Sequence, residues 1–413
     1  MTSYVEINAC RVSGSKNLVT VLDLGHQALT GVFPSDSATP VTVGPLQLVW
    51  CPDSGLLQLK HSYAASEMYG DNYGYRSGLN QSMVAHLTDK VAYLERMVAP
   101  RPGEVIVDIG SNDATTLKAY KSPGLERVGI DPTGRKFAEF YPADVRLVPD
   151  FFSADAYRSV QPNKPARIVT SIAMFYDLEA PIEFARQIES ILADDGVWHF
   201  EQSYMPSMLR LNSYDTICHE HIEYYSLGVV KTILEAAGLR LLDVAMNGIN
   251  GGSFAVTAAK SSNRSLKTNS AVVDWLLAQE TRMGLATPKP YRDFEERVFR
   301  HRDDLTRLIR ALNADGKRVL GYGASTKGNV VLQFCGLTAK DIPAIAEVNA
   351  EKFGRVTPGT HIPIVSEKDA LAMKPDYYLV LPWHFKDSIL RREKEFLAQG
   401  GKFIFPFPEI EII

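Results

Sequence analysis

The sequence predicts a chain of the α/β class, with a small β-rich N-terminal domain followed by two domains that are each built on a mostly parallel sheet. Three observations support this division. Apolar stretches before residue 75 are short and interrupted by Gly, Pro and Ser, strand-like and helical stretches alternate after Arg101-Pro-Gly103, and the alternation restarts near residue 318. We therefore expect domains at 1–75, 76–262 and 263–413.

Composition limits the class of protein and the kind of partner. The 413 residues are 45% hydrophobic, which is enough to build two or three separate cores. Lys plus Arg number 44 and Asp plus Glu number 48, so a nucleic acid partner is not expected. No signal-peptide pattern opens the chain and no apolar run reaches membrane-spanning length, so we expect a cytoplasmic protein with no membrane partner.

The N-terminal domain contains two cysteines, Cys10 and Cys51, at places where small domains of this kind often use paired Cys-x-x-Cys motifs to bind a metal. The partner positions hold Ser13 and Ser54, which are poor zinc ligands. We expect no bound metal here. The core of this domain is then expected to come from apolar residues, namely Val19, Leu22, Leu24, Leu46, Leu48 and Leu57.

The central domain is predicted to begin with an amphipathic helix over residues 83–98, because its apolar residues recur at helical spacing. Near-continuous apolar stretches follow, and each is separated from the next by a helical or loop segment. This pattern indicates buried parallel strands. The predicted strands are 105–109, 127–130, 145–148, 168–172 and 197–201, and 239–244 and 253–258 complete the unit.

A long charged helix, residues 291–313, is predicted to connect the central domain to the last one. Strand-like stretches then resume at 318–321, 342–347, 377–381 and 402–405, which indicates a second and smaller parallel sheet. Two αβ domains of this kind are expected to face each other across a cleft.

The first strand of the central domain ends in a turn that contains a single glycine, Gly110. A dinucleotide fingerprint would have Gly-x-Gly-x-x-Gly here, to make room for a pyrophosphate. Acidic residues surround the turn instead, which suits a cationic or zwitterionic ligand such as S-adenosylmethionine. The predicted cofactor contacts at this turn are Asp108, Gly110, Ser111, Asn112 and Asp113.

The next two strand ends carry further candidates for the same cofactor. Asp131, followed by Pro132, closes the second strand and is placed to hold ribose hydroxyls. Asp150, Phe151 and Phe152 follow the third strand, where a carboxylate can accept from an adenine amine and a ring can stack on the base. The three strand ends in succession predict S-adenosylmethionine.

The segment 213–227 gathers the residues best suited to acid/base chemistry, among them His219, Glu220, His221, Glu223 and Tyr224. Imidazole titrates near neutral pH, and a neighbouring Glu can orient it and raise its basicity. The His-x-His spacing also permits metal binding, but no third ligand stands nearby. We favour proton transfer over metal binding.

A glycine-rich turn, Leu320-Gly-Tyr-Gly-Ala-Ser-Thr-Lys-Gly-Asn329, opens the last domain. Ser, Thr and Lys at a helix N-terminus are typical of a phosphate site, because free N–H groups and the helix dipole favour an anion. Tight strand-to-helix packing explains Gly321 and Gly323 equally well, but it does not explain Lys327. We therefore predict a diphosphate ligand.

These motifs together resemble the sugar C-methyltransferases that methylate C3 of nucleotide-linked 4-keto-6-deoxysugars. The motifs are Tyr73-Gly-Tyr-Arg-Ser-Gly78, Asp108-Ile-Gly-Ser-Asn-Asp113, the Glu220-His221 pair and Gly321-Tyr-Gly-Ala-Ser-Thr-Lys327, and the similarity covers the entire chain. The resemblance implies a central class I methyltransferase domain of Rossmann-like fold that binds S-adenosylmethionine. It also implies a C-terminal Rossmann-like domain that helps to hold the nucleotide-sugar.

The resemblance implies residue roles as well. The base is matched by His221, with Glu220 beside it and a tyrosine matched by Tyr73 or Tyr75. We expect Tyr75, His219 or Tyr224 to stabilise the enolate oxygen. The expected substrate-binding residues are Asn80, Tyr322, Ala324, Ser325, Lys327, Asn329, Glu347 and Lys352.

Two positions depart from the family pattern. Ser13 and Ser54 replace two of four zinc-binding cysteines, and Ala114 stands where the cofactor turn usually has glycine. Two other functions are kept as alternatives. One is an NAD-dependent sugar-nucleotide oxidoreductase, against which the one-glycine turn argues, and the other is a binding module without catalysis.

Overall fold

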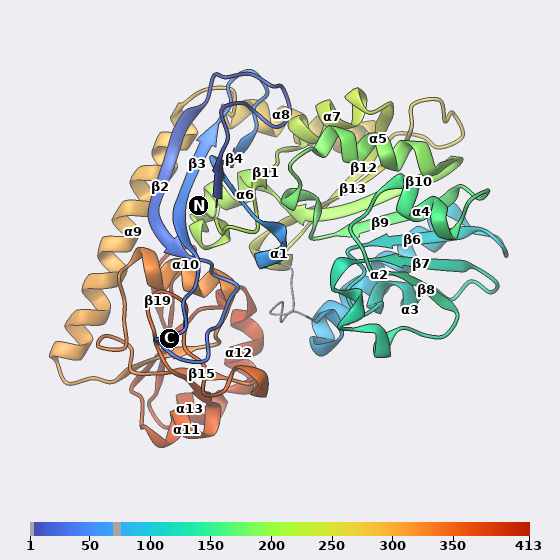
Figure 1. The fold of residues 1–413 in the computed structure, drawn as a ribbon. Helices are drawn as coiled ribbons and strands as arrows, with labels where there is room; N and C mark the ends of the chain where they lie inside the picture. The colour runs from blue at the N-terminus through green and yellow to red at the C-terminus, as the bar shows by residue number, and fades with distance from the viewer. Residues whose placement is uncertain (1–3, 69–75) are drawn as a thin grey trace.

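The computed structural model describes residues 4–68 and 76–413. Figure 1 shows three lobes, with the N-terminal sheet beside the C-terminal domain and the central domain opposite them. The described residues form four sheets, of two, four, seven and six strands. This architecture confirms the predicted fold class, while the exact domain limits stay predictions. Tyr73 and Tyr75 lie outside the described residues.

The N-terminal sheet is antiparallel and includes a strand from the middle of the chain. β2 (Val19–Ala28) pairs with β3 (Val43–Trp50), β3 with β4 (Leu57–Leu59), and β4 with β11 (Glu223–Tyr224). A separate ribbon joins β1 (Tyr4–Glu6) to β5 (His61–Tyr63), and the short helix α1 (Ala65–Met68) follows. The predicted acid/base segment is therefore fixed to the N-terminal domain through β11.

The core predicted for this domain is largely present. Leu22, Leu46, Leu48 and Leu57 are fully buried and Leu24 nearly so. Val19 is a correction, since it is 40% exposed at the first position of β2. The sheet packs against the long helix α9 (Lys289–Ala314) and against Met205, Met208 and Leu209 of the central domain, so its apolar face is covered by distant parts of the chain.

The central sheet has seven strands in the order β12-β13-β10-β9-β6-β7-β8. Six strands run in one direction, and β13, which runs antiparallel to them, is inserted between β10 and β12. The sequence of these strands is near-continuously apolar because helices cover both faces of the sheet. The bounds are β6 Val105–Ile109, β7 Glu126–Ile130, β8 Val145–Val148, β9 Ala166–Ile172, β10 Leu192–Ser203, β12 Leu239–Asn247 and β13 Ser253–Lys260.

Helices cover both faces of this sheet. The predicted first helix is α2 (Gln81–Val98), and its N-cap Asn80 accepts hydrogen bonds from the backbone N–H groups of Ser82 and Met83. The other helices are α3 Thr115–Ala119, α4 Ala154–Val160, α5 Pro181–Ile191, α6 Met205–Leu211 and α7 Leu227–Ala236.

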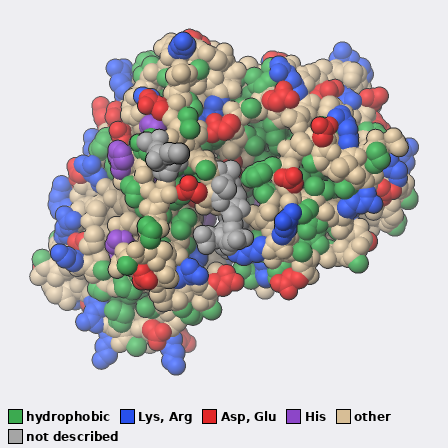
Figure 2. Space-filling view, in the orientation of Figure 1, with side chains coloured by type: hydrophobic (Ala, Val, Ile, Leu, Met, Phe, Trp, Pro, Cys, Tyr) green, Lys and Arg blue, Asp and Glu red, His purple; other side chains and the backbone are tan. Residues whose placement is uncertain are grey.

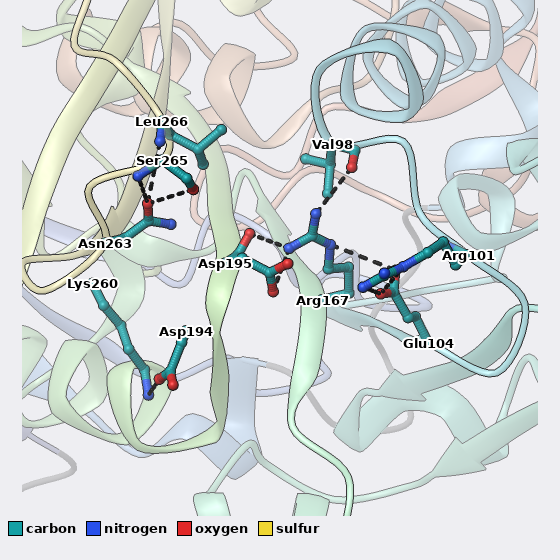
Figure 3. Close-up of polar contacts among 10 residues, drawn as sticks. All are labelled: Val98, Arg101, Glu104, Arg167, Asp194, Asp195, Lys260, Asn263, Ser265 and Leu266. Carbon is teal, nitrogen blue, oxygen red and sulfur yellow. Dashed lines mark hydrogen bonds and ion pairs between the residues drawn. The ribbon is translucent and has the colours of Figure 1, made fainter.

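Ion pairs join residues near the amino ends of the strands of the central sheet, opposite the strand ends predicted to bind the cofactor (Figure 3). Arg167 pairs with Glu104 and Asp195 and donates to the Val98 carbonyl oxygen at 3.0 Å, while Arg101 pairs with the same Glu104. Nearby, the side chain of Asn263 accepts three bonds that fold the chain after β13. Because the charged groups pair with one another, we infer a structural role for this end of the sheet.

The C-terminal domain has five parallel strands and one antiparallel strand. The sheet order is β16-β15-β14-β17-β18-β19. Its strands are β14 Val319–Tyr322, β15 Ile345–Glu347, β16 Ile364–Ser366, β17 Tyr377–Val380, β18 Lys402–Phe405 and β19 Glu411–Ile412. Its helices are α9 Lys289–Ala314, α10 Thr326–Phe334, α11 Glu367–Ala372, α12 Lys386–Arg392 and α13 Lys394–Ala398, whereas α8 (Ser270–Arg282) packs on β12 and α7 of the central domain.

A loop of the N-terminal domain is fastened to helix α10. The Gln333 side chain exchanges hydrogen bonds with the backbone of Ala28 at 2.7 and 3.1 Å, and Asn329 Nδ2 donates to the Thr30 carbonyl oxygen at 2.8 Å. The same helix contacts the short η5 helix (Tyr214–Thr216) that precedes His221. The N-terminus of α10 is therefore brought beside the acid/base segment.

Within residues 4–68 and 76–413, no helix is both long and apolar enough to span a lipid bilayer. Basic and acidic side chains are intermixed on the face shown in Figure 2. That mixture agrees with the near balance of charge in the sequence.

Candidate functional site

One large cavity brings the separate sequence motifs together. Its volume is about 1830 Å³, and it is lined by the strand ends of the central domain, the acid/base segment and the glycine-rich turn. The predicted site residues that line it are Asn80, Asp108, Gly110, Ser111, Asn112, Asp131, Pro132, Phe151, Phe152, Glu220, His221, Tyr322, Ala324, Ser325, Lys327, Glu347 and Lys352.

Asp108 lies near the end of β6 and lines the part of the cavity that is predicted to bind the cofactor. Its carboxylate accepts a hydrogen bond from Thr170 Oγ1 at 2.5 Å. Burial raises its pKa to about 7, although the hydroxyls of Thr170 and Thr116 oppose that effect. A cationic ligand nearby would favour the ionised form of this carboxyl group, as expected for a sulfonium cofactor.

The turn after Asp108 depends on left-handed backbone. Gly110 has φ +71°, and a Cβ there would lie 3.2 Å from Met174 Cγ. Ala114, at the position where the family usually has glycine, has φ 61° and is fully buried. The alanine thus adopts the glycine-like conformation and keeps the shape of the turn, at a cost of about 1–2 kcal/mol.

Asp131 is held rigidly at the end of β7. One carboxylate oxygen accepts the backbone N–H of Asn112 at 2.7 Å, and the other accepts the backbone N–H and the hydroxyl of Thr133, both at 2.6 Å. These bonds fix the carboxylate beside the turn, and the residue lines the cavity. The geometry is compatible with a ribose contact.

Two aromatic rings follow β8 at the rim of the cavity. Phe151 is 53% exposed, and Phe152 packs edge-on against Phe184 with 5.1 Å between ring centroids. Asp150 does not line the cavity, and its carboxylate accepts the backbone N–H of Phe151 at 2.7 Å. Of the three residues predicted after this strand, the two rings are therefore placed to meet a base.

Asp113 faces away from the cavity and ties the segment before α2 to the cofactor turn. Its carboxylate accepts the backbone N–H of Gly78 at 3.0 Å and pairs with Arg76 Nε at 3.6 Å. Asn112 Oδ1 likewise accepts the backbone N–H of Ser77 at 3.0 Å. The segment that follows the Tyr-x-Tyr motif is thus anchored directly on the cofactor turn.

His221 is oriented as a base. Its Nδ1 lies 3.1 Å from the Thr216 carbonyl oxygen, which can only accept, so Nδ1 carries the proton and Nε2 keeps its lone pair. Burial, and then the charge of Lys327, lowers the pKa of His221 to about 4. The Tyr176 ring packs edge-on against the imidazole, with 4.3 Å between the ring centroids. His221 is therefore neutral at pH 7 and able to accept a proton.

Glu220 lines the cavity next to His221 and is confined by the N-terminal loop. Thr30 Oγ1 donates to its carboxylate at 3.4 Å, and burial raises its pKa. A Cβ built on Gly31 would lie only 2.4 Å from Glu220 Oε1. The absence of a side chain at Gly31 is therefore what leaves room for this carboxyl group.

Three predicted residues are packed away from the cavity. His219 is fully buried, with its ring edge-on to Tyr63 at 4.7 Å, and burial lowers its pKa to about 4. The Tyr224 hydroxyl donates to the Thr216 carbonyl oxygen at 3.4 Å, and Asn329 serves the Thr30 contact described above. Each would reach a ligand only if this packing moved, so their roles stay predictions.

The structure also bears on the metal alternative. Among the residues that it describes, no three His, Cys, Asp or Glu side chains converge as a metal-binding group. His219 packs against Tyr63, whereas His221 lines the cavity, so the two imidazoles lie in different surroundings. This pair therefore does not form a shared metal site.

In the C-terminal domain, packing explains the glycines of the turn. Cβ atoms would lie 2.6 Å from Ile345 at Gly321 and 2.7 Å from Pro382 at Gly323, which has φ +80°. Ser325 caps α10 by accepting the backbone N–H of Gly328 at 3.0 Å. The turn thus presents a capped helix N-terminus to the cavity.

Charged residues beside the turn are held by backbone contacts. Glu347, at the end of β15, accepts the backbone N–H groups of Ala324, Val348 and Asn349 at 2.8 to 2.9 Å. Lys352 Nζ donates to the Ala324 carbonyl oxygen at 2.7 Å. The Tyr322 hydroxyl donates to Glu393 at 2.8 Å.

Sequence reasoning missed several residues that line the cavity, including Tyr176, Asp177, Asn250, Arg355 and Trp383. Tyr176 and Asp177 follow β9, and the rule that ligands bind at the carboxyl ends of parallel strands could have found them. Asn250, Arg355 and Trp383 lie in loops without a local signal. Only the packing of the domains brings them to the cavity.

The four positions of the degenerate cysteine motif do meet in space. Cys10 Sγ lies 3.2 Å from Ser54 Oγ, and Cys51 Sγ lies 3.5 Å from Ser13 Oγ. Two thiols and two hydroxyls therefore occupy the places of four ligands. Structural zinc sites use four thiolate or imidazole ligands, so this set does not fit the metal.

Comparison with known proteins agrees with the three lobes. Family models match residues 10–69 ("Putative zinc binding domain"), 83–244 ("Methyltransferase domain") and 248–408 ("C-methyltransferase C-terminal domain"). The chain is 34% identical over 410 residues to the C-methyltransferase NovU of Streptomyces niveus, covering 98% of this chain and 97% of that protein.

Solved structures are similar over less than half of this chain. The plantazolicin methyltransferase BpumL, in complex with an analog and SAH, is 13% identical with a TM-score of 0.36, over 45% of this chain and 87% of that one. The mitomycin 7-O-methyltransferase MmcR is 16% identical with a TM-score of 0.31, over 44% and 55%. At these scores neither bears on the substrate. From the full-length match and the family models, the chain belongs to the C-methyltransferase family, with S-adenosylmethionine as its methyl donor.

Proposed function

We propose that this enzyme transfers a methyl group from S-adenosylmethionine to C3 of a nucleotide-linked 4-keto-6-deoxysugar. The observation that carries the proposal is the placement of His221. Its free Nε2 belongs to a neutral imidazole in the same cavity as the acidic strand ends and the glycine-rich turn. The candidate base and the regions predicted to bind the cofactor and an anion therefore line the same cavity.

The chemistry requires a base because a C–H group is not a nucleophile until its proton is removed. A 4-ketone acidifies the neighbouring C3 proton by accepting the charge as an enolate. When His221 takes that proton on Nε2, its Nδ1–H bond to the Thr216 carbonyl becomes charge-assisted and stabilises the imidazolium. S-adenosylmethionine, when bound, supplies an electrophilic methyl group to the resulting carbon nucleophile.

The rest of the cavity suits the remainder of such a substrate. The α10 N-terminus and its turn offer N–H groups to a diphosphate, and Lys352 adds a positive charge at the same turn. Glu347 is placed at a strand end, where carboxylates commonly accept from ribose hydroxyls. The predicted substrate residues Asn80, Tyr322, Ala324 and Ser325 line the same space.

The test is methyl transfer to a panel of nucleotide-linked sugars with and without the 4-ketone, read by mass spectrometry and by NMR of the product. The same assay without S-adenosylmethionine, in deuterium oxide, measures exchange at C3. We expect His221→Ala to abolish both transfer and exchange while cofactor binding is retained. The matched control is His26→Ala, at an exposed histidine of β2.

Two outcomes would contradict the proposal. Exchange that persists in His221→Ala would move the base to another residue. Failure of the wild-type enzyme to methylate any 4-ketosugar, with transfer to another carbon acid, would replace the substrate class. Calorimetric binding of NAD in preference to S-adenosylmethionine would restore the oxidoreductase alternative.

A further inference from the structure

We propose that Lys327 is a catalytic residue that donates a hydrogen bond to the C4 oxygen of the sugar while C3 is deprotonated, and that it does not hold the diphosphate. This inference rests on the proposed function and assigns a role within the same site. It differs from the expectation set by the sequence, in which the lysine of the glycine-rich turn is a phosphate ligand.

The position of Lys327 supports this role. It is the second residue of α10, and its Nζ donates to the carbonyl oxygen of Asn250 at 3.0 Å. Asn250 belongs to the short helix η6 (Ile249–Gly251) between β12 and β13, so the ammonium group reaches from the C-terminal domain to the central domain. Both residues line the cavity at the junction of the two domains.

The neighbouring residue places this helix end beside the base. A Cβ built on Gly31 would lie 2.4 Å from Glu220 Oε1 and 3.8 Å from Thr326 Oγ1, so Glu220 and Thr326 border the same small space. Thr326 directly precedes Lys327 and Glu220 directly precedes His221. The α10 N-terminus and the Glu220-His221 pair are therefore adjacent.

Charge balance favours an anion between these groups. Burial lowers the pKa of the Lys327 ammonium group and the charge of Asp215 opposes that effect, while the charge of Lys327 in turn helps to lower the pKa of His221. A proton that arrives on His221 would place two cations near each other. Negative charge that develops on the C4 oxygen at the same moment offsets that repulsion, so the pair is suited to enolate formation.

For a diphosphate at this turn, Lys352 and Arg355 are better suited than Lys327. The Lys327 ammonium group has a buried acidic neighbour, Asp215, whose carboxylate accepts Trp383 Nε1–H at 2.8 Å. Arg355 donates to the carbonyl oxygens of Phe33 and Glu351, both at 2.9 Å, and carbonyl groups leave its charge unneutralised. Arg355 and Lys352 line the same cavity, and although Lys352 lies 4.0 Å from Glu347, the two cations together fit the diphosphate.

The step balances as follows. The C3–H bond breaks and its proton goes to His221 Nε2, while the electron pair forms the C3–C4 double bond and the carbonyl pair moves to the C4 oxygen. Lys327 Nζ–H donates to that oxygen. When C3 then forms its bond to the methyl carbon, the C4 carbonyl is restored and the sulfur retains the pair of the broken S–CH₃ bond.

The test compares two sets of variants. We expect Lys327→Met to lower kcat for methyl transfer, and the rate of C3 exchange at saturating substrate, by about 100- to 1,000-fold, as on removal of one oxyanion donor. Its Kd for dTDP or UDP, whichever binds the wild type, should change by less than about threefold. Lys352→Met with Arg355→Met should weaken that Kd at least about tenfold and keep C3 exchange at saturation.

Chemical rescue separates catalysis from a structural role. Lys327→Cys treated with 2-bromoethylamine regains an amine, and we expect C3 exchange to recover with it. The four native cysteines are buried, so wild-type protein treated in the same way is the control. Folding of each variant is checked by its melting temperature.

Other results would overturn the inference. Lys327→Met that weakens dTDP or UDP binding as much as it slows turnover, with normal exchange at saturation, would identify a phosphate ligand. A folded variant with unchanged kcat would leave Lys327 no catalytic role. Absence of transfer to any 4-ketosugar by the wild type would instead reject the proposed function, so the two failures are distinguishable.

Discussion

Restoring two thiols in the N-terminal domain should create a zinc site that the natural sequence lacks. In a tetrahedral site with Zn–S bonds of about 2.3 Å, neighbouring sulfur atoms lie about 3.8 Å apart. The two cysteine–serine pairs are 3.2 and 3.5 Å apart, so each pair has to separate by only about 0.3–0.6 Å to reach that spacing. We therefore expect the double variant Ser13→Cys, Ser54→Cys to bind zinc without rearranging the backbone.

The local backbone already has the form that such a site needs. The backbone N–H groups of Val12 and Ser13 point at Cys10 Sγ at 3.4 and 3.5 Å. Burial raises the pKa of the Cys51 thiol, but hydrogen bonds from Ser54 and Ser13 and from backbone N–H groups outweigh it, and the net effect is to lower the pKa. These hydrogen bonds therefore make the Cys51 thiol easier to ionise, as zinc binding requires.

The size of the effect follows from binding linkage. At free zinc 1,000 times the Kd, binding to the folded state alone adds about 4 kcal/mol to the free energy of unfolding. A melting temperature shift of about 15–30 °C follows if the N-terminal domain unfolds as a unit of roughly 60–100 residues. The assay is elemental analysis together with thermal melts before and after chelation, with Ser13→Ala, Ser54→Ala as the matched control.

We expect the wild type and the alanine control to contain much less than one zinc per chain and to be insensitive to chelation, and the cysteine variant to contain one. Stoichiometric zinc in the wild type, lost together with stability on chelation, would refute the reasoning. It would mean that the two thiols recruit other ligands such as His26 or His61. A cysteine variant without zinc would show that the spacing argument fails.

Three further predictions concern the main site and the core. Asp131→Ala should raise the Kd for S-adenosylmethionine about 10- to 100-fold by calorimetry, since hydrogen bonds to a charged group are worth about 1.5–3 kcal/mol. Gly31→Ala should lower kcat with little change in cofactor Kd, because its Cβ would lie 2.4 Å from Glu220 Oε1. Burial lowers the pKa of His219 to about 4. Between about pH 6.5 and pH 4, this imidazole is therefore protonated in the unfolded chain but not in the folded protein. Stability therefore falls as the pH falls through that window, and His219→Phe should reduce the slope by up to about 1.4 kcal/mol per pH unit in urea titrations.

Each of these has a result that would contradict it. An unchanged cofactor Kd in Asp131→Ala would remove the ribose contact from this strand end. Normal turnover in Gly31→Ala would show that Glu220 can move without consequence. An unaltered slope in His219→Phe would mean that the imidazole is protonated within the fold, and urea titration at pH 7 supplies the reference stability for both proteins.

The sequence by itself determined the class of the fold and most of its regular elements. The strands β6, β8 and β18 have the predicted bounds, and α9 differs from the prediction by only a few residues. These elements are long or strongly apolar, so their periodicity is a local property of the chain. The strands β16 and β19, with three and two residues, are too short to show a period and were not predicted.

The cofactor region was predictable for a related reason. Asp108 and Asp131 each end a parallel strand, and parallel strands with right-handed crossovers bring their carboxyl ends to one edge. Residues that follow successive strands in the sequence therefore lie side by side at the cavity. The family comparison confirms the cofactor, whereas the individual residue roles stay predictions.

Only the tertiary structure decided which candidates face the cavity. Local sequence does not separate His219 from His221, and only the family resemblance matched the base to His221, but in the structure His219 packs against Tyr63 and only His221 lines the cavity. Lys327 is a residue of a phosphate-like turn in the sequence but meets Asn250 of another domain in space. Such contacts join segments far apart in the chain, and they depend on how three separately formed domains pack together, which no local pattern of residues encodes.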